Sequence, residues 1–599
     1  MDLSKNAVEY EDMDERIAES FIGGRGYGVK RLYDHNPKLE PYSEESWIGL
    51  YTGPVTGTAM PLANRLTIVF RSPLTRTIAY ANTGGYAAAA LKLAGFDGIE
   101  ITGKSQTPKY ILAKDGRLDL LDASSLWGRG ASECIRILKA KHGDVRVLSI
   151  GVAGENMVKF ANIVNDAGRS SGVRHGAGGV FGSKELKAVA IAADYTKRVP
   201  VADREGFMGV LKRVDAKIRA SPMLNRATGL FSTYGTPLAV DPLSRYEALP
   251  FHNYTQTRFE GASELTGQKM SSTILISRLT CSACPVQCRR ETAGVRKYSF
   301  RGEGPDYAQI SSLGTNCGVG DLESIAYMNY LCYELGLDPI ETGNLLAILA
   351  QATEKGLVSP ELGLRWGDVD RMVDLIHLIS TRSDMGGTLA EGAVALCNTL
   401  GDPFLSTAVK GITIQNADPR VEYAWGLLNA TENSGASTHI WVYPDLIYAF
   451  VDLLGERSLV AHIAQNEYDK LASAVILKQD LVAVLDSLQI CAFSSMAYDL
   501  EDYVDALNTV TGWSMGQDEL FRVGERIFNL ERIYNEVNGV GGDTLPARFL
   551  SEPVPSGRNM GKVCPLGELL EKYYKLRGWE GGRVGEPKLK ELSLPSLVS

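Results

Sequence analysis

Four cysteines carry the residue pattern with the clearest chemistry. Cys281, Cys284 and Cys288 lie in the run CSACPVQC, and Cys491 ends the run LDSLQIC far downstream. The first three form a C-x2-C-x3-C pattern, which lets one loop hold three corners of an iron–sulfur cube. A [4Fe–4S] cluster needs four thiolates, and the fourth commonly comes from a distant segment. The pattern therefore indicates electron transfer in a redox enzyme.

Two other interpretations of these cysteines remain open. Three close cysteines can bind structural zinc, usually completed by a fourth Cys or His at similarly tight spacing. The sequence has no second close pair of cysteines. A disulfide needs an oxidising compartment, and we find no signal peptide at the start of the sequence. The cluster is favoured over both alternatives.

The composition excludes several classes of protein. The chain has 599 residues, of which 44% are hydrophobic and 22% charged, as in ordinary folded proteins. The net charge is −9, and no Lys/Arg cluster forms a nucleic-acid surface. With only 7 His, a multi-histidine metal centre is not expected. No stretch reaches the about 18 apolar residues of a membrane helix, so we expect a cytoplasmic protein without a membrane span.

Changes of pattern along the chain predict three domains. Residues 1–199 alternate short β-like runs with Gly-rich turns, which indicates a β-rich α+β domain. After the segment KRVPVADREG the patterns become helical, so residues 200–405 form a predicted helical domain that contains the cysteine loop. Residues 406–599 form a third, mostly helical domain. The predicted helices include 204–221, 321–335 and 341–356.

Three Gly-rich segments lie in the first domain. They are GGRGYG (23–28), GPVTGT (53–58) and GVRHGAGGVFGSK (172–184). Glycine allows the backbone to approach a phosphate or ring closely, and successive N–H groups can cradle anions. None of the segments is a Walker A motif or a convincing dinucleotide fingerprint. Each alone can be a simple turn, but together they favour a large phosphorylated cofactor.

The sequence resembles the family of tungsten-containing aldehyde:ferredoxin oxidoreductases over nearly its whole length. The resemblance rests on segments in one order, among them FIGGRGYGVKRLYD, GPVTGTAMPLANRLTIVFRSPLT, NTGGYAAAALKLAGFDGIEITGKS, CSACPVQC, ELGLDPI, DSLQIC and YYKLRGW. It implies a β-rich base that holds tungsten between two pterin dithiolenes, with two helical domains closing over it. It also implies a [4Fe–4S] cluster beside one pterin, which passes electrons to ferredoxin.

The resemblance implies roles for individual residues. The four cysteines named above would be the cluster ligands. Arg65 falls at the position that bridges cluster and pterin, a role that suits a permanently charged fork of donors. The alternative is a solvated arginine at a strand end. Asn82 matches a residue at the Mg²⁺ that links the pterin phosphates, and Arg174, in the third Gly-rich segment, is expected to bind the cofactor.

Pterins in this family are held by two D-x-x-G-L-[D/C] motifs, because a carboxylate can accept hydrogen bonds from a ring N–H and an exocyclic amine. The second motif runs from Asp486 to Cys491 and has lost its Gly-Leu. The first runs from Tyr333 to Asp338, so tyrosine replaces the leading Asp. We expect one pterin to be held differently, with Glu334 or the Tyr333 hydroxyl as substitute. Alternatively, Asp338 only caps the next helix.

The segment that carries a catalytic glutamate in aldehyde-oxidising members has changed here. It reads GPDYA, which places Ala308 at the glutamate position, and alanine cannot move a proton. Asp306 or Glu303 is the expected substitute acid. His439 matches the histidine near the metal and is expected to be functional. Tyr327 stands where an iron ligand of a metal-bridged dimer would lie, which leaves that dimer in question.

The expected reaction is oxidation of an aldehyde to a carboxylic acid, with electrons leaving through the cluster. Two alternatives stay open. One is a tungsten-dependent reductase of another substrate class, such as an aromatic acyl-CoA thioester, and Ala308 motivates it. The other is a non-catalytic electron relay, motivated by the altered motifs at Tyr333 and Gln489. The expected partners are a low-potential carrier, a small-molecule substrate, and a second copy or an electron-transfer subunit.

Overall fold

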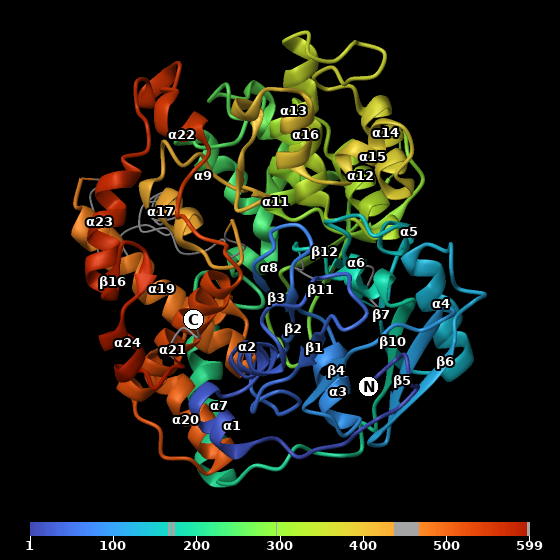
Figure 1. Ribbon diagram of the computed structural model, residues 1–599, viewed down its shortest axis with the longest axis vertical. Helices are drawn as coiled ribbons and strands as arrows, with labels where there is room; N and C mark the ends of the chain where they lie inside the picture. The colour runs from blue at the N-terminus through green and yellow to red at the C-terminus, as the bar shows by residue number, and fades with distance from the viewer. Residues whose placement is uncertain (166–168, 171–173, 295, 437–465, 596–599) are drawn as a thin grey trace.

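The computed structural model describes residues 1–165, 169–170, 174–294, 296–436 and 466–595 (Figure 1). Strands dominate the first part of the chain, and the remainder is largely helical. In Figure 1 the blue and cyan sheets occupy the lower right, the green and yellow helices lie above them, and the orange and red helices lie to the left. This arrangement confirms the predicted strand-rich first part followed by largely helical parts.

The first sheet is antiparallel and has the strand order β3-β2-β1-β4. Its strands are β1 (Ile48–Tyr51), β2 (Leu66–Arg71), β3 (Ile78–Thr83) and β4 (Gly98–Ile101). Every residue of β2 is buried, as expected for a strand in a sheet covered on both faces. Helix α2 (Gly24–His35) packs on one face. The second sheet shares a hydrophobic core with the other face.

The second sheet has six strands in the order β6-β5-β10-β7-β8-β9. They are β5 (Lys109–Lys114), β6 (Arg117–Asp122), β7 (Val145–Ile150), β8 (Ile163–Asn165), β9 (Arg169–Ser170) and β10 (Leu186–Ala192). Helices α3 (Ala87–Leu93) and α6 (Ala177–Ser183) contribute to the core between the sheets. Helix α4 (Ala131–His142) packs on β7 and joins a separate core on the outer face.

The predicted helices of the middle part are present, and each begins at an aspartate. Helix α7 covers Arg204–Ala220, α12 covers Leu322–Leu335 and α13 covers Pro339–Glu354. The side chains of Asp203, Asp321 and Asp338 accept hydrogen bonds from backbone N–H groups of the first turns. Such N-caps satisfy donors that have no partner inside the helix. The cysteine loop connects β11 (Leu275–Leu279) to β12 (Arg289–Ala293).

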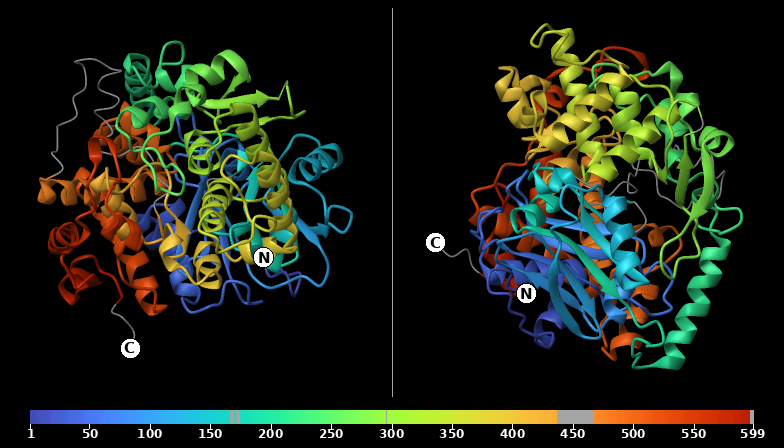
Figure 2. Two further views of the ribbon diagram at one scale, coloured as in Figure 1. Left: turned by 90° about the horizontal axis from the view of Figure 1, so that it is seen from above. Right: turned by 90° about the vertical axis from the view of Figure 1, so that its right-hand side faces the viewer.

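Helix α19 (Tyr468–Leu488) is the central element of the last part. It packs against α21 (Gln517–Val537), α23 (Leu566–Arg577) and also α2 of the strand-rich part. Helix α7 packs on α20 (Leu500–Thr511), so the chain crosses to the last part directly after the sheets. In both views of Figure 2 the green–yellow and orange–red helices lie on different sides of the sheets. The domain boundaries at 199/200 and 405/406 stay predictions.

No helix in the described ranges is long and apolar enough to span a membrane.

Candidate functional site

The four cysteines come together although Cys491 lies far from the other three in sequence. Burial and the neighbouring cysteines Cys288, Cys281 and Cys491 raise the pKa of the Cys284 thiol well above its usual value, which places all four thiols in one cluster. Cys281 and Cys491 are buried, and Cys284 and Cys288 are half-buried. All nine cysteines are free, so no disulfide forms. Among the described residues, no group of three or more His, Cys, Asp or Glu converges tightly enough to hold one metal ion.

Backbone hydrogen bonds of Leu62 join the two cysteine segments. Its N–H donates to the carbonyl of Ala283 at 3.1 Å, and its carbonyl accepts from the N–H of Cys491 at 2.9 Å. The loop itself is folded by the Thr280 hydroxyl, which donates to the carbonyl of Cys284 at 2.6 Å. The segment before β2 therefore fixes the distance between the cysteine loop and Cys491.

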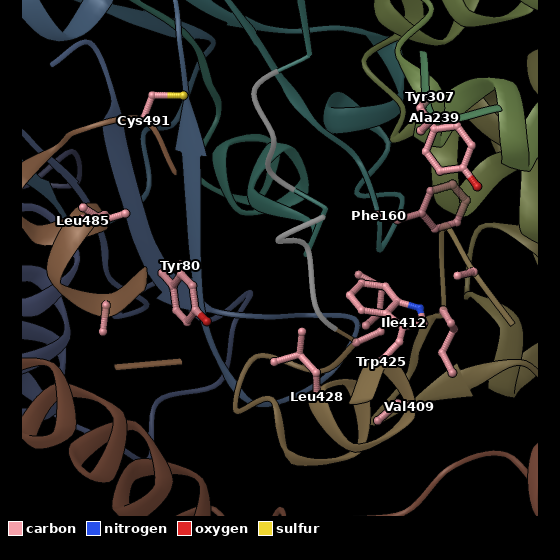
Figure 3. Packing of buried hydrophobic residues seen from close by; sticks show 14 of the residues in the cluster. Tyr80, Phe160, Ala239, Tyr307, Val409, Ile412, Trp425, Leu428, Leu485 and Cys491 are labelled. Atoms are coloured by element: carbon pink, nitrogen blue, oxygen red, sulfur yellow. The ribbon is translucent and has the colours of Figure 1, made fainter. Parts of the chain in front are cut away.

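Arg65 lies against the cysteines, not in solvent. Its Nη2 is 2.9 Å from the Sγ of Cys491. A Cβ added to Gly84 would lie 2.4 Å from Nη1 of Arg65 and 3.1 Å from Sγ of Cys281. Only glycine fits this position, because the guanidinium and a thiol already occupy the space. Figure 3 shows Cys491 beside the blue strands of the first sheet. Arg65 directly precedes β2 of this sheet.

Asp486 lies in the last turn of α19, in a buried network of charges. Its Oδ2 is 3.4 Å from Nη1 of Arg25, and Nε of Arg25 donates to Oε1 of Glu531 at 2.7 Å. Burial raises the pKa of Asp486 to about 6, while Arg25, Asn82 and Arg65 act in the opposite direction. Asp486 is thus a carboxylate held in the interior among donors.

Asn82 pairs with this carboxylate across the first sheet. It lies opposite Thr67 in the register of β2 and β3, and the Thr67 hydroxyl donates to its Oδ1 at 2.5 Å. Its side chain also forms a hydrogen bond with Asp486. The structure therefore brings Arg65, Asn82 and Asp486 together on one side of the sheet, beside the cysteines.

Arg174 and Asp338 form a second buried group. Nε of Arg174 is 3.1 Å from Oδ2 of Asp338, and Nη2 is 3.2 Å from Oε2 of Glu341. Burial raises the pKa of Glu341 to about 7, and Arg174 opposes this shift. Asp338 also accepts from the N–H of Ile340 at 2.9 Å, so it both caps α13 and pairs with Arg174. Nη1 of Arg174 and Oε1 of Glu341 have no hydrogen-bond partner among the described residues.

The two proposed substitutes for the missing Asp of the first motif point in different directions. The Tyr333 hydroxyl is buried and lies 3.5 Å from Nε2 of Gln309. Glu334 instead accepts from the Ser132 hydroxyl near the start of α4. Of the two, only Tyr333 faces the interior around the altered GPDYA segment.

Ala308 is buried at the start of an irregular helix. It lies in α11 (Tyr307–Gln309), which continues into a π-helical turn over Ile310–Gly314. Such turns are frequent at functional sites. Nε of Arg289 donates to Oε1 of Glu303 at 2.7 Å, so this acid is committed to a buried ion pair. Oδ1 of Asp306 accepts from the Thr236 hydroxyl at 3.0 Å, and Asp306 remains the better candidate for a replacement acid.

The two remaining predicted positions are His439 and Tyr327. His439 lies outside the described residues. The ring of Tyr327 stacks on that of Tyr298, with centroids 4.1 Å apart and planes 5° from parallel. Tyr327 is thereby part of an aromatic pair, and its relation to a dimer stays untested.

Sequence analysis missed the partners that hold the predicted residues. Arg25 lies inside the first Gly-rich segment, and its salt bridge to Glu531 spans 506 residues. In the sequence, Gln489 stands out only as the residue that replaces a motif glycine. An arginine between glycines was a usable signal for a buried cation, but no local pattern identifies its partner.

Comparison with known proteins identifies the class of this chain. The profile "Aldehyde ferredoxin oxidoreductase, N-terminal domain" matches residues 1–193, and "Aldehyde ferredoxin oxidoreductase, domains 2 & 3" matches residues 209–594. The tungsten-containing aldehyde ferredoxin oxidoreductase of Thermococcus kodakarensis is 39% identical, with 100% of this chain and 98% of that protein covered. That of Pyrococcus furiosus is 38% identical, with 99% and 98% covered.

More distant similarities extend to other activities. The "Aliphatic sulfonate oxidoreductase, WOR-like subunit" of Pyrococcus furiosus is 29% identical, with 99% of this chain and 96% of that protein covered. The solved structure "Active site complex BamBC of Benzoyl Coenzyme A reductase in complex with 1,5 Dienoyl-CoA" superposes with a TM-score of 0.83 at 24% identity, covering 99% of this chain and 96% of that one. This last similarity concerns the fold alone.

These matches define an oxidoreductase of the tungsten–pterin class. The chain belongs to the aldehyde ferredoxin oxidoreductase family, whose members carry pterin and iron–sulfur cofactors.

Proposed function

We propose that this enzyme oxidises an aldehyde to a carboxylic acid at tungsten held by two pterins. Electrons leave through a [4Fe–4S] cluster to ferredoxin or another low-potential carrier of an anaerobic cytoplasm. The observation that carries this proposal is the gathering of Cys281, Cys284, Cys288 and Cys491 beside Arg65. The full-length identity of 38–39% to tungsten-containing aldehyde ferredoxin oxidoreductases supports it.

The residues present fit a large, charged cofactor. Gly84 lets the backbone lie directly against the Arg65 guanidinium and the Cys281 thiol, which keeps these two groups together. Nη1 of Arg174 is buried without a partner among the described residues, as expected of a donor that awaits a ligand. The Asn82 side chain is engaged by Thr67 and Asp486, and the Mg²⁺ expected there stays a prediction.

The roles of the protein groups follow from their positions. When bound, the tungsten–pterin cofactor supplies the two-electron redox chemistry. The four thiolates would hold the cluster. Arg65 compensates their negative charge and donates to Sγ of Cys491. Asp486 would accept hydrogen bonds from N–H groups of a pterin.

Because residue 308 is alanine, proton transfer needs a different ionisable residue. We assign the role of general base to Asp306, with His439 as its expected companion. Asp306 shares the environment of the cluster loop, because both it and Cys288 raise the pKa of Arg290. Burial outweighs both and lowers that pKa to about 10. A base at this position would take the proton released as water adds to the substrate carbonyl.

A second candidate is reduction of an aromatic acyl-CoA thioester. Ala308 favours it, because a buried alanine stands where aldehyde-oxidising members have their glutamate. The solved benzoyl coenzyme A reductase complex described above shares the fold. In this reaction the chain would act with an electron-donating subunit instead of delivering electrons to ferredoxin.

A substrate panel separates the two candidates. Anaerobically purified protein is assayed with aliphatic and aromatic aldehydes, following reduction of ferredoxin or a viologen dye. It is assayed in parallel with benzoyl-type CoA thioesters and a reduced low-potential dye. Turnover of aldehydes supports the first candidate, and turnover of thioesters alone would replace it with the second.

A further inference from the structure

Gln489 occupies a backbone conformation that its side chain disfavours. It follows the last residue of α19 with φ +65° and ψ +31°, in the left-handed region. L-residues rarely adopt this region, because Cβ approaches the following carbonyl, and glycine is the usual choice there. The family motif has glycine at this position, whereas this chain reads Asp486-Ser-Leu-Gln. A strained residue at such a position needs a compensating interaction.

The Gln489 side chain is fully buried and held at one end. Its Nε2 donates to Oγ1 of Thr67 at 2.5 Å and to the backbone carbonyl of Asp486. A Cβ added to Gly24 would lie 2.0 Å from this nitrogen, so the side chain fills the space beside α2. A carbonyl oxygen only accepts, so the amide NH₂ must face Asp486, and this fixes the orientation of the side chain.

The other end of the same amide has no hydrogen-bond partner in the part of the chain that the structure describes. Oε1 of Gln489 is buried and accepts no hydrogen bond from any described residue. A buried acceptor without a donor is costly, and native structures usually supply one. Two nearby donors among the described residues are already used. The N–H of Arg65 donates to the backbone carbonyl of Gln489 at 3.2 Å, and Asn82 pairs with Thr67 and Asp486.

We infer that Gln489 is a positioning residue whose Oε1 accepts a hydrogen bond from a ring N–H or amino group of a bound pterin, next to Asp486. This inference rests on the proposed function, because it needs a pterin at Asp486. A glycine at this motif position has no side chain, whereas the Gln489 amide offers an additional hydrogen-bond acceptor. The cofactor thus supplies the missing donor, and the strain at Gln489 is retained for binding.

The test uses two substitutions in the loaded enzyme. Gln489→Gly relieves the backbone strain and removes the acceptor, whereas Gln489→Met keeps the bulk without the acceptor. Asp115→Gly is the matched control for strain, because Asp115 has φ +48° in the exposed turn between β5 and β6. Pterin and tungsten per chain, the rate of pterin release on warming, and the potential of the tungsten centre are measured for each.

We expect both Gln489 variants to release pterin about fivefold faster than wild type, as loss of one hydrogen bond predicts. The tungsten potential should become more positive, because the pterin loses an electron-donating acceptor. Asp115→Gly, which relieves the same kind of strain in an exposed turn, should leave pterin release and the tungsten potential unchanged. Unchanged release and potential in both variants would reduce Gln489 to a space-filling residue. Wild-type protein without pterin would instead overturn the proposed function, and this inference with it.

Discussion

Lys478 is a buried lysine with no ion pair to any residue that the structure describes. It lies on α19, its side chain is 7% exposed, and neither a hydrogen bond nor a salt bridge joins it to another described residue. Burial lowers the pKa of its ammonium group to about 7, and the charge of Asp486 opposes this shift only in part. We predict that Lys478→Met stabilises the cofactor-free protein, because methionine keeps an unbranched apolar chain and removes the charge.

The size of the effect follows from the two pKa values. With 10.5 in the unfolded chain and about 7 in the folded one, the buried charge costs about 5 kcal/mol at pH 6 and about 2 kcal/mol at pH 9. Between these two pKa values the unfolded state binds more protons than the folded state, so wild-type stability rises with pH in this window. The advantage of Lys478→Met should therefore shrink as the pH rises.

Denaturant unfolding of the cofactor-free protein at pH 6 and pH 9 measures this directly. Lys104→Met serves as control, because Lys104 is exposed and its replacement should change stability little at either pH. If Lys478→Met does not raise the free energy of unfolding, or raises it equally at both pH values, Lys478 is not a buried cation.

Three more predictions concern the redox site. Cys491→Ser should lose cluster iron, because a hydroxyl is a poor ligand, whereas Cys564→Ser should keep it; unchanged iron in the first variant would remove Cys491 from the ligand set. Arg65→Lys keeps the charge but loses the fork of donors, so a redox titration should give a more negative cluster potential at unchanged iron, and an unaltered potential would contradict the contact with Cys491. Asp306→Asn keeps an acceptor for Thr236 but cannot take a proton, so turnover should fall by about a hundredfold, and near-normal rates would clear Asp306 of that role.

Much of the secondary structure could be predicted because its signals are local. The stretch 204–221 was predicted helical, and α7 covers Arg204–Ala220 after an aspartate N-cap. The run LTIVFR of β2, rich in β-branched and aromatic residues, likewise marks a strand. The gathering of the cysteines was predictable from spacing together with the chemistry of iron–sulfur clusters.

The remainder depends on contacts between distant segments. The Arg25–Glu531 pair spans 506 residues, and no local pattern indicates it. Leu62 connects the cysteine loop to Cys491 through its backbone, which side-chain chemistry cannot reveal. Sequence alone left Glu334 and Tyr333 as equal substitutes, and only the structure turns Glu334 towards Ser132.

The most direct test of the central claim is elemental analysis of anaerobically purified protein, grown with both tungstate and molybdate. We predict about one tungsten and about four iron atoms per chain, the content of a tungsten–pterin site with one [4Fe–4S] cluster. Iron at that level with neither tungsten nor molybdenum would contradict the proposed enzyme and would leave only an electron-relay role for the cysteines.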